Sequence, residues 1–537
     1  MRIAAAAARR NEREAQRAER EKAIAKAAEK AKINEMLALL RPLRSFAVKD
    51  NGELDTLNLL RPPQMLGVAT EYISDDGSLN SDKDMEGTEA RGGSARKAKA
   101  ALILLLSEVG ILPAVFDFVT AGDVFRNRLW CKSFRRLVSQ MPLNLRVSKN
   151  ESLALCVFLR EASEDGGTAL FPLQHLRGLH LSSLTERHVK NLTPAITNGA
   201  FEKLSTLHVT FTPTEGLLGI NLFFGAIQER PPPRLRTLDL TGSYLGDEGF
   251  QFLANIFQSG SCNSIEHLLL GQNGCSDRGA RKLFTALGNP RCEAVLKTLD
   301  LARNNIEDDG ARILFKALRK PALSSLRTLN VCGNQFSYVA VASELVPSVT
   351  KRGCIKWRTI NLSQNAIGDS GLVPLFEGLT DNIAGCFYGL QKCALSSTEL
   401  GDATVDALSE VMQSGMLQKL TSIDLSYNWI HASGMRALGA ALTRQSLPRL
   451  KVLNLANNHG GDEGIDHLSV ALQLGGCRVL QVLDISFNQG NRCMQHLAMV
   501  IKKNCCPSLR ELVITGNAPP HIRPHRLFKG VKGLNTR

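Results

Sequence analysis

Apolar residues in the last two-thirds of this 537-residue chain follow a pattern that returns about every 30 residues. Each unit begins apolar-x-x-apolar-x-apolar-x-x-Asn, most clearly in residues 296–304 (LKTLDLARN). Units begin at Leu176, Leu204, Leu235, Ile265, Leu296, Leu326, Trp357, Leu390, Leu420, Leu450, Leu480 and Leu509. Since each unit is too short to bury a core alone, this period predicts a solenoid in which neighbouring units stack.

The start of each unit predicts a short strand. In residues 238–240 and 329–331, apolar side chains alternate with one that faces solvent. The ninth position is Asn in eight units, where an amide can satisfy buried backbone groups at the turn. These asparagines are Asn273, Asn304, Asn334, Asn365, Asn428, Asn458, Asn488 and Asn517. The other units hold Leu184, Thr212, Ser243 and Thr398 at this position, so we expect less regular turns there.

The second half of each unit predicts an amphipathic helix. Residues 309–318 have apolar residues at helical spacing after an acidic start, and similar segments recur around Gly249, Gly279, Gly371, Gly434 and Gly464. The acidic residue suits a helix start by capping and by the helix dipole. The pattern resembles the ribonuclease-inhibitor-like class of leucine-rich-repeat proteins over roughly residues 170–518. This resemblance implies an α/β solenoid, a horseshoe with a parallel concave sheet and convex helices, which we assign to residues 143–518.

A second resemblance precedes the solenoid, in residues 100–142. An apolar segment is followed by an Asp-initiated helix at Asp123 and a closing Trp-Cys-Lys-Ser-Phe element at 130–134, which together resemble an F-box. The Leu-Pro pair usual near the start of that motif is displaced to Leu112-Pro113. The resemblance implies docking to a Skp-type linker subunit of a cullin ubiquitin ligase through Val124, Phe125, Leu129, Cys131, Phe134 and Leu137. The alternative is a helical cap that closes the open end of the solenoid.

Charge and composition divide the rest of the chain. Of the formal charge of +14, residues 1–49 carry 13 Lys/Arg against 6 Glu, and residues 519–537 carry five Lys/Arg and no acid. We interpret these as a basic helical extension and a basic tail, with a flexible linker at 50–99. Such tails favour weak contacts with RNA or acidic surfaces. The sequence shows no transmembrane segment or signal peptide, and its 13 cysteines lack paired spacing, which indicates the cytoplasm or nucleus.

The sequence predicts no catalytic, cofactor-binding or metal site. It contains no P-loop, no H-E-x-x-H and no G-x-S-x-G motif. His180 and His208 share the exposed mid-strand position of the first two units and could be neighbours on the concave face. Two stacked histidines could bind a metal or respond to pH, but we interpret them as solvated strand residues.

Candidate partner-binding residues lie on the concave face. Asp or Asn occupies the mid-strand position in seven of twelve units, and the aspartates are Asp239, Asp300, Asp424 and Asp484. An acidic row of this kind favours a basic partner. Tyr427, Trp429 and Phe487 occupy exposed turns after C-terminal strands, and such residues are frequent at interface hot spots.

These observations predict a non-enzymatic protein-binding adaptor. The F-box resemblance implies the substrate-recognition subunit of a ubiquitin ligase. One alternative is a leucine-rich-repeat scaffold or GTPase regulator similar to the Ran GTPase-activating protein, although that family usually ends in an acidic tail. Another is RNA binding through the basic ends.

Overall fold

The structure is a computed structural model in which all described residues lie within Thr120–Arg537. They comprise residues 143–147, 152–164, 176–213, 217–290, 292–350, 357–380, 387–444, 446–517, 527–531 and 533–537. The expected extension (1–49), linker (50–99) and F-box-like segment (100–142) lie outside the described residues.

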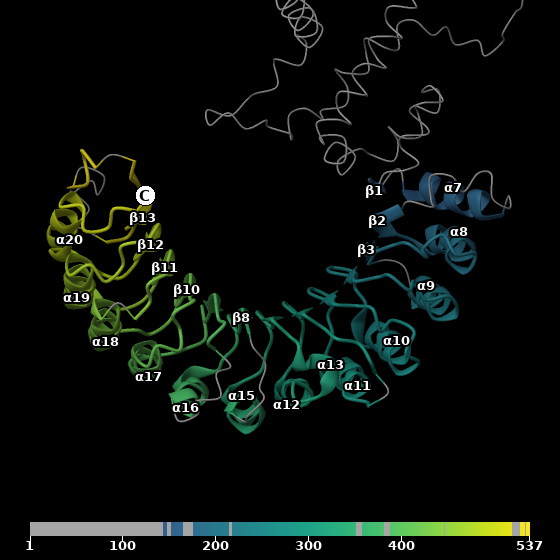
Figure 1. The fold of residues 1–537 in the computed structure, drawn as a ribbon, viewed down its shortest axis with the longest axis horizontal. Coiled ribbons are helices and arrows are strands. Elements are labelled where there is room, and N and C mark those ends of the chain that lie inside the picture. The colour runs from purple at the N-terminus through teal and green to yellow at the C-terminus, as the bar shows by residue number, and fades with distance from the viewer. Residues whose placement is uncertain are drawn as a thin grey trace, which may run out of the picture. The chain divides into compact units, whose positions relative to one another are not determined.

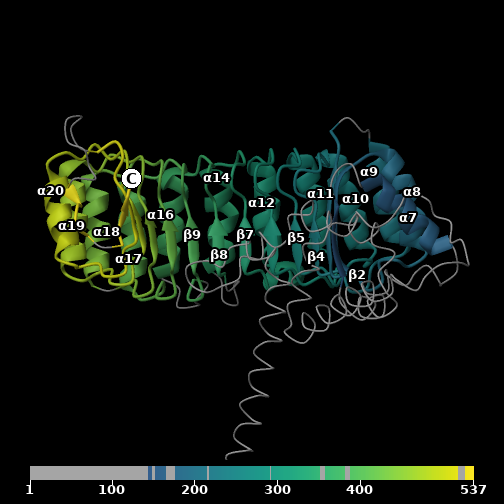
Figure 2. The same cartoon turned by 90° about the horizontal axis from the view of Figure 1, so that it is seen from above.

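A single parallel sheet runs through the repeats in chain order, with strands on the inner face and helices on the outer face (Figures 1 and 2). The strands are β1 (Leu143–Val147), β2 (Leu176–Leu184), β3 (Thr206–Phe211), β4 (Thr237–Asp239), β5 (His267–Leu269), β6 (Thr298–Asp300), β7 (Thr328–Asn330), β8 (Thr359–Asn361), β9 (Lys392–Ala394), β10 (Ser422–Asp424), β11 (Val452–Asn454), β12 (Val482–Asp484), β13 (Glu511–Val513) and β14 (Asn535–Thr536). The expected horseshoe architecture is confirmed.

Helices return the chain between successive strands. They are α7 (Ser152–Glu164), α8 (Glu186–Thr197), α9 (Leu217–Glu229), α10 (Gly246–Gln258), α11 (Asp277–Leu287), α12 (Asp308–Ala317), α13 (Pro321–Ser324), α14 (Tyr338–Ala340), the π-helix η3 (Val341–Leu345), α15 (Val346–Thr350), α16 (Gly368–Thr380), α17 (Asp402–Gln413), α18 (Ala432–Thr443), α19 (Gly461–Gln473) and α20 (Cys493–Lys502). The broken run α14–η3–α15 contains Pro347, which lacks the N–H that a regular helix needs.

The sheet extends beyond the twelve predicted units at both ends. β1 pairs with β2 and is followed by α7, so one further strand–helix unit precedes Leu176. At the other end β14 pairs with β13, and Phe528 is buried. The interpretation of residues 519–537 as a tail is therefore wrong for the described residues 535–536, which form the last strand.

The ninth-position asparagines join neighbouring units, as the pattern predicts. The buried Asn273 donates from Nδ2 to the Leu240 and Leu270 carbonyl oxygens, each at 2.9 Å. Its Oδ1 accepts from the Ser243 N–H at 3.0 Å. One side chain thus satisfies backbone groups of its own unit and of the unit before it, which holds adjacent strands in register.

The four units without Asn behave in two ways. β2 and β3 are longer than the other strands, and their register shifts between Leu181 and Leu184, so irregularity is confirmed there. At Thr398 the prediction is wrong. Its Oγ1 donates to the Leu395 carbonyl oxygen at 2.9 Å, and its N–H reaches Asn428 Oδ1 at 2.9 Å. Ser243 is also held, through Oγ to the Val209 carbonyl oxygen at 2.7 Å. A hydroxyl can therefore replace the amide.

The acidic residues at helix starts have a role that the sequence did not reveal. Asp247 on α10 accepts from the Ser276 N–H at 2.8 Å and the Gly279 N–H at 3.1 Å, at the start of α11. A Cβ at position 279 would lie 2.7 Å from Asp247 Oδ1, so this approach requires glycine. Asp277, Asp308, Asp369, Asp402 and Asp462 make equivalent bonds to the backbone of the following unit. Each carboxylate therefore caps the next unit's helix region, in addition to lying at its own helix N-terminus.

Candidate functional site

The mid-strand residues form one continuous row across the concave face. Strand register aligns Arg146, His180, His208, Asp239, Leu269, Asp300, Asn330, Asn361, Ala394, Asp424, Asn454, Asp484 and Val513 as successive neighbours. The four aspartates singled out in the sequence therefore share this row. They are not contiguous, because apolar and amide residues separate them.

The aspartates of the row also close the turns after their strands. Asp424 Oδ1 accepts from the Ser426 N–H at 3.1 Å and from Ser426 Oγ at 2.6 Å, and Asp484 bonds to Ser486 in the same way. Asp300 accepts from the Ala302 N–H and from Asn330 Nδ2, each at 2.9 Å. The Asp/Asn preference therefore has a structural cause, and part of the carboxylate capacity is already used.

His180 and His208 are neighbours on the concave face, as their shared strand position allows, and both are only partly exposed to solvent. Their rings stack with centroids 3.8 Å apart, and His208 Nδ1 lies 2.6 Å from Asp239 Oδ2. Burial, His208 and Arg146 lower the pKa of His180 to about 4, so its imidazole is neutral at pH 7. Burial alone would raise the pKa of Asp239, but hydrogen bonds from His208 and Thr241 outweigh it and lower that pKa.

The three predicted aromatic residues lie at the edge where the strands end. Tyr427 and Trp429 are each 60% exposed and Phe487 is 52% exposed. Their backbones are fixed, because the N–H groups of Tyr427, Trp429 and Phe487 bond to the carbonyl oxygens of Ala456, Leu400 and Thr515. Large side chains are thus held in the open by a rigid frame.

The backbone at Tyr427 and Phe487 is unfavourable for a bulky residue. Their φ angles are 56° and 53°, in the left-handed region that favours glycine. A left-handed φ at the equivalent turn position is adopted elsewhere by Ser183, Gly242, Gln272, Arg303, Gly333, Gln364, Ser397, Asn457 and Gly516, none of which is aromatic. The turn itself therefore does not call for an aromatic residue.

Two histidines that sequence reasoning missed adjoin these residues. The rings of His431 and His459 have centroids 5.4 Å apart, and Gln489 Nε2 lies 3.0 Å from His459 Nδ1. His459 directly follows the ninth-position Asn458, as Trp429 follows Asn428, and this shared offset is the signal that could have found it. His431 lies two residues after Trp429. We call Tyr427, Trp429, His431, His459 and Phe487 the aromatic patch.

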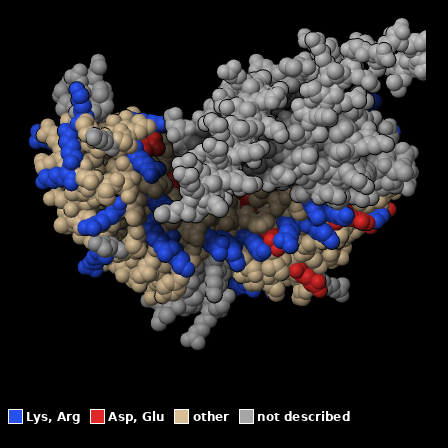
Figure 3. All heavy atoms as spheres, turned by 45° about the horizontal axis from the view of Figure 1, so that its top comes forward, with Lys and Arg blue, Asp and Glu red and all other residues tan. Residues whose placement is uncertain are grey.

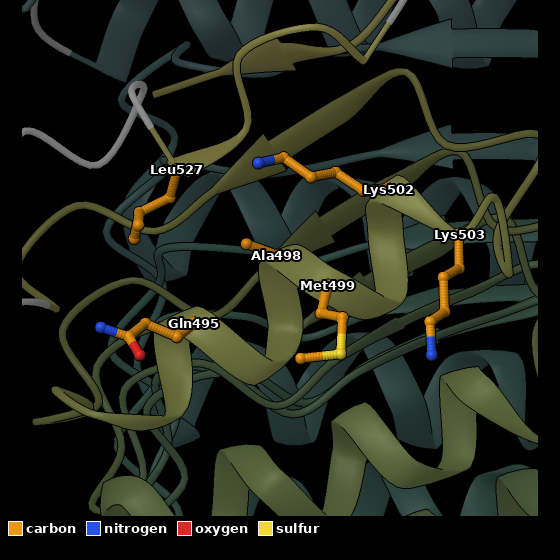
Figure 4. A pocket seen from close by; sticks show the side chains of 6 residues that line it. All are labelled: Gln495, Ala498, Met499, Lys502, Lys503 and Leu527. Atoms are coloured by element: carbon orange, nitrogen blue, oxygen red, sulfur yellow. The ribbon is translucent and has the colours of Figure 1, made fainter.

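The described surface has an open depression near the C-terminal end of the solenoid. This depression of about 450 Å³ lies beside α20 and is lined by Gln495, Ala498, Met499, Lys502, Lys503 and Leu527 (Figure 4). No carboxylate, imidazole or thiol is among these lining residues. Within the described ranges, no cluster of three or more His, Cys, Asp or Glu is placed to hold a metal ion.

The described cysteines belong mainly to the core. Burial raises the pKa of the Cys156, Cys262, Cys393, Cys477 and Cys506 thiols to about 12, so they remain protonated at neutral pH. Cys505 and Cys506 are both free.

Comparisons with known proteins agree with this geometry. The family described as "Leucine Rich repeat" matches residues 294–314, 358–376 and 417–439. The fold is a leucine-rich-repeat solenoid. The ribonuclease inhibitor of Sus scrofa is 28% identical over 369 residues, which cover 68% of this chain and 75% of the inhibitor. NACHT, LRR and PYD domains-containing protein 12 of Homo sapiens is 28% identical over 287 residues, 48% of this chain and only 25% of that protein.

Solved structures with related repeats are more distant. An internalin from Listeria monocytogenes has a TM-score of 0.38 at 14% identity, covering 72% of this chain and 96% of the internalin. A chain of the yeast Rad7 and Elc1 complex has a TM-score of 0.37 at 12% identity, covering 85% and 98% of the two chains. Among the helices of the described residues, none is both long enough and apolar enough to cross a membrane.

Proposed function

We propose that this protein is a non-enzymatic scaffold that binds another protein through the aromatic patch and the adjoining part of the concave row. The observation that carries the proposal is the exposure of Tyr427, Trp429 and Phe487 on a fixed backbone. Aromatic side chains dominate interface hot spots, and a rigid surface loses little entropy on binding. The similarity to a protein named as a ribonuclease inhibitor, whose name denotes binding and not catalysis, supports this reading.

The partner's contact surface is expected to be basic. Asp424 and Asp484 lie on the concave row in the same units as Tyr427 and Phe487, and the exposed Glu399 precedes Leu400, which accepts from the Trp429 N–H. Cationic side chains bind aromatic faces as well as carboxylates. A partner surface with Lys or Arg side chains could therefore bind both the aromatic side chains and the carboxylates of this region.

The test compares exposed aromatic residues inside the patch with an exposed tyrosine outside it. Tyr427→Ala/Trp429→Ala should reduce recovery of the bound protein at least tenfold in quantitative affinity purification of the full chain, since hot-spot truncations cost about 2 kcal/mol or more. Tyr244→Ala is the matched control, because Tyr244 is 59% exposed and also has a left-handed φ, but lies six units before the unit that contains Tyr427. An interactome that the double substitution leaves unchanged would refute the proposal.

A finer form of the proposal connects the scaffold to ubiquitin ligation. In this form residues 100–142 bind a Skp-type linker subunit, through Val124, Phe125, Leu129, Cys131, Phe134 and Leu137, in the cytoplasm or nucleus. Its support is the Trp-Cys-Lys-Ser-Phe element at 130–134. Deleting residues 104–140 should abolish recovery of the linker subunit and leave the partner of the aromatic patch bound. Failure of the intact chain to recover a linker subunit or cullin would remove this form and leave a plain scaffold.

A further inference from the structure

Basic residues line the edge of the sheet where the strands begin. The second position of the twelve units holds Arg177, Ser205, Arg236, Glu266, Lys297, Arg327, Arg358, Gln391, Thr421, Lys451, Gln481 and Arg510. Seven are cationic and one is acidic. Basic and acidic residues nearly balance over the chain between its two basic ends, but at this edge the charge is almost entirely positive. Figure 3 shows Lys and Arg in a row along this edge. We call the seven cationic residues the basic ridge.

The middle of the basic ridge places like charges side by side. The Arg327 N–H bonds to the Lys297 carbonyl oxygen at 2.8 Å, and the Arg358 N–H bonds to that of Arg327 at 2.7 Å. Lys392 adjoins them, because its N–H bonds to the Arg358 carbonyl oxygen at 3.0 Å. Like charges on neighbouring strands destabilise a sheet. This arrangement therefore does not serve the fold.

Pairing within the repeats relieves only part of this repulsion. Lys297 Nζ lies 2.7 Å from Glu266 Oε2. Within the described part of the chain, neither Arg327 nor Arg358 has a carboxylate within ion-pair distance, although both are exposed. Elsewhere, Arg312 on α12 pairs with Asp309, and Arg319, which follows that helix, pairs with Glu344. Among the described residues, the two adjacent guanidinium groups of Arg327 and Arg358 therefore remain open to a partner's carboxylates.

We infer that the basic ridge binds an acidic segment of a protein partner, an inference that rests on the proposed scaffold function and adds a second contact to it. A guanidinium group forms two parallel hydrogen bonds to a carboxylate, and successive parallel strands present such groups about 4.8 Å apart. An extended acidic segment that runs across β6 to β9 would meet Lys297, Arg327, Arg358 and Lys392 in turn.

The neighbouring rows restrict the width of this partner. Inward from the ridge lie the hydroxyl side chains of Thr298, Thr328 and Thr359, which can donate to carboxylates. One step further inward are Asp300 and, two units earlier, Asp239. A nucleic acid carries phosphates over a broader surface and would bring some of them against these aspartates. A single acidic peptide segment avoids that repulsion, so the geometry favours a protein partner.

The test uses oligoglutamate as the probe and carbodiimide as a zero-length crosslinker between carboxylates and lysines. With the full chain, peptide mapping should find crosslinks at Lys297 and Lys392, decreasing as salt rises. Arg327→Glu/Arg358→Glu should reduce their yield at least tenfold, because two favourable contacts are lost and two negative charges then face the acidic probe. Lys282→Glu/Lys316→Glu, which changes the same charge on α11 and α12, should leave the yield unchanged.

Three results would overturn the inference. They are equal yields in the wild type and the arginine variant, a similar loss in the helix variant, and displacement of the probe by single-stranded oligouridine RNA at lower concentrations than by unlabelled oligoglutamate. The last result would assign the ridge to nucleic acid. Tyr427→Ala/Trp429→Ala should not affect these crosslinks, so failure of the ridge and failure of the aromatic patch are distinguishable.

Discussion

The two edges of the sheet carry charge in different ways. Where strands end and helices begin, acidic residues such as Asp247, Asp402 and Asp462 accept backbone N–H groups of the next unit. Where strands begin, Arg327 and Arg358 lie beside each other without a carboxylate partner among the described residues. Charge at the strand-end edge stabilises the repeats, whereas charge at the strand-start edge remains available to a partner. Charge density alone would not distinguish these roles.

The largest effect is expected from the core that both edges share. Leu301 is fully buried, so Leu301→Asp should lower the free energy of unfolding by about 4 kcal/mol or more, because an unpaired charge enters the stacked repeats. Chemical denaturation measures this change. Asn305→Asp, at an exposed position of the same unit, is the control and should have little effect. A Leu301→Asp protein as stable as wild type would contradict the assigned register.

Removing one acidic cap tests the structural role of the strand-end edge. Asp462→Ala should cost about 1 kcal/mol, as expected for a lost helix-region cap, while Glu463→Ala next to it should cost much less because that side chain is largely exposed. Burial tends to raise the pKa of Asp462, but backbone N–H groups of Asn491 and Cys493 outweigh it and lower the pKa to about 2. Its contribution should therefore be present above pH 3.8 and be lost as the pH falls toward 2. Equal effects of the two substitutions would argue against the cap.

The histidine stack between the edges predicts a smaller, pH-dependent effect. The pKa of His180 is about 4 in the folded protein and near 6.5 in the unfolded chain. The unfolded state therefore binds a proton first as the pH falls, and stability should decrease between pH 6.5 and 4. Solvent screening at this half-buried site limits the loss to about 1 kcal/mol. His180→Gln should make the denaturation midpoint depend less on pH over that range. If the midpoint changed with pH as steeply as in the wild type, the pKa assigned to His180 would be wrong.

The smallest effect is expected at the strand-start edge. Arg327→Gln/Arg358→Gln should leave the stability unchanged or raise it by up to about 0.5 kcal/mol, since it removes repulsion between neighbouring strands. Chemical denaturation measures the change in the free energy of unfolding, and Asp462→Ala is measured alongside as the variant expected to lose stability. A loss comparable to that of Asp462→Ala would show that the ridge stabilises the fold, and the distinction between the edges would disappear.

Features repeated within one unit were predictable from the sequence. The period placed the strands, the apolar spacing placed most of the helices, and the ninth-position Asn identified the turns. The mid-strand row followed directly, because stacking in register brings Asp300 next to Asn330. The turns that hold Tyr427, Trp429 and Phe487 could also be located, because each of these residues lies next to the ninth-position Asn of its unit.

Features that depend on two units were harder to predict. Asp247 bonds to Ser276, 29 residues later, and nothing near Asp247 in the sequence marks that partner. The first unit, β1 and α7, lacks the full leucine pattern, so the sequence placed it within the solenoid without predicting its strand and helix. The basic ridge was concealed because its residues are about 30 positions apart and the total charge averages them with acids on the opposite edge.

The bonds between units also point in opposite directions along the chain. Asp247 reaches forward to the next unit, while Asn273 reaches back to Leu240 and Ser243 of the unit before it. An insertion or deletion inside a unit would leave unsatisfied the backbone groups that bind both the forward-reaching aspartates and the backward-reaching asparagines. Duplication or loss of a whole unit alters these bonds only at the new junction. The chain can therefore lengthen or shorten by one unit at a time during evolution. Each such step would change the reach of the surface and preserve the separate characters of its two edges.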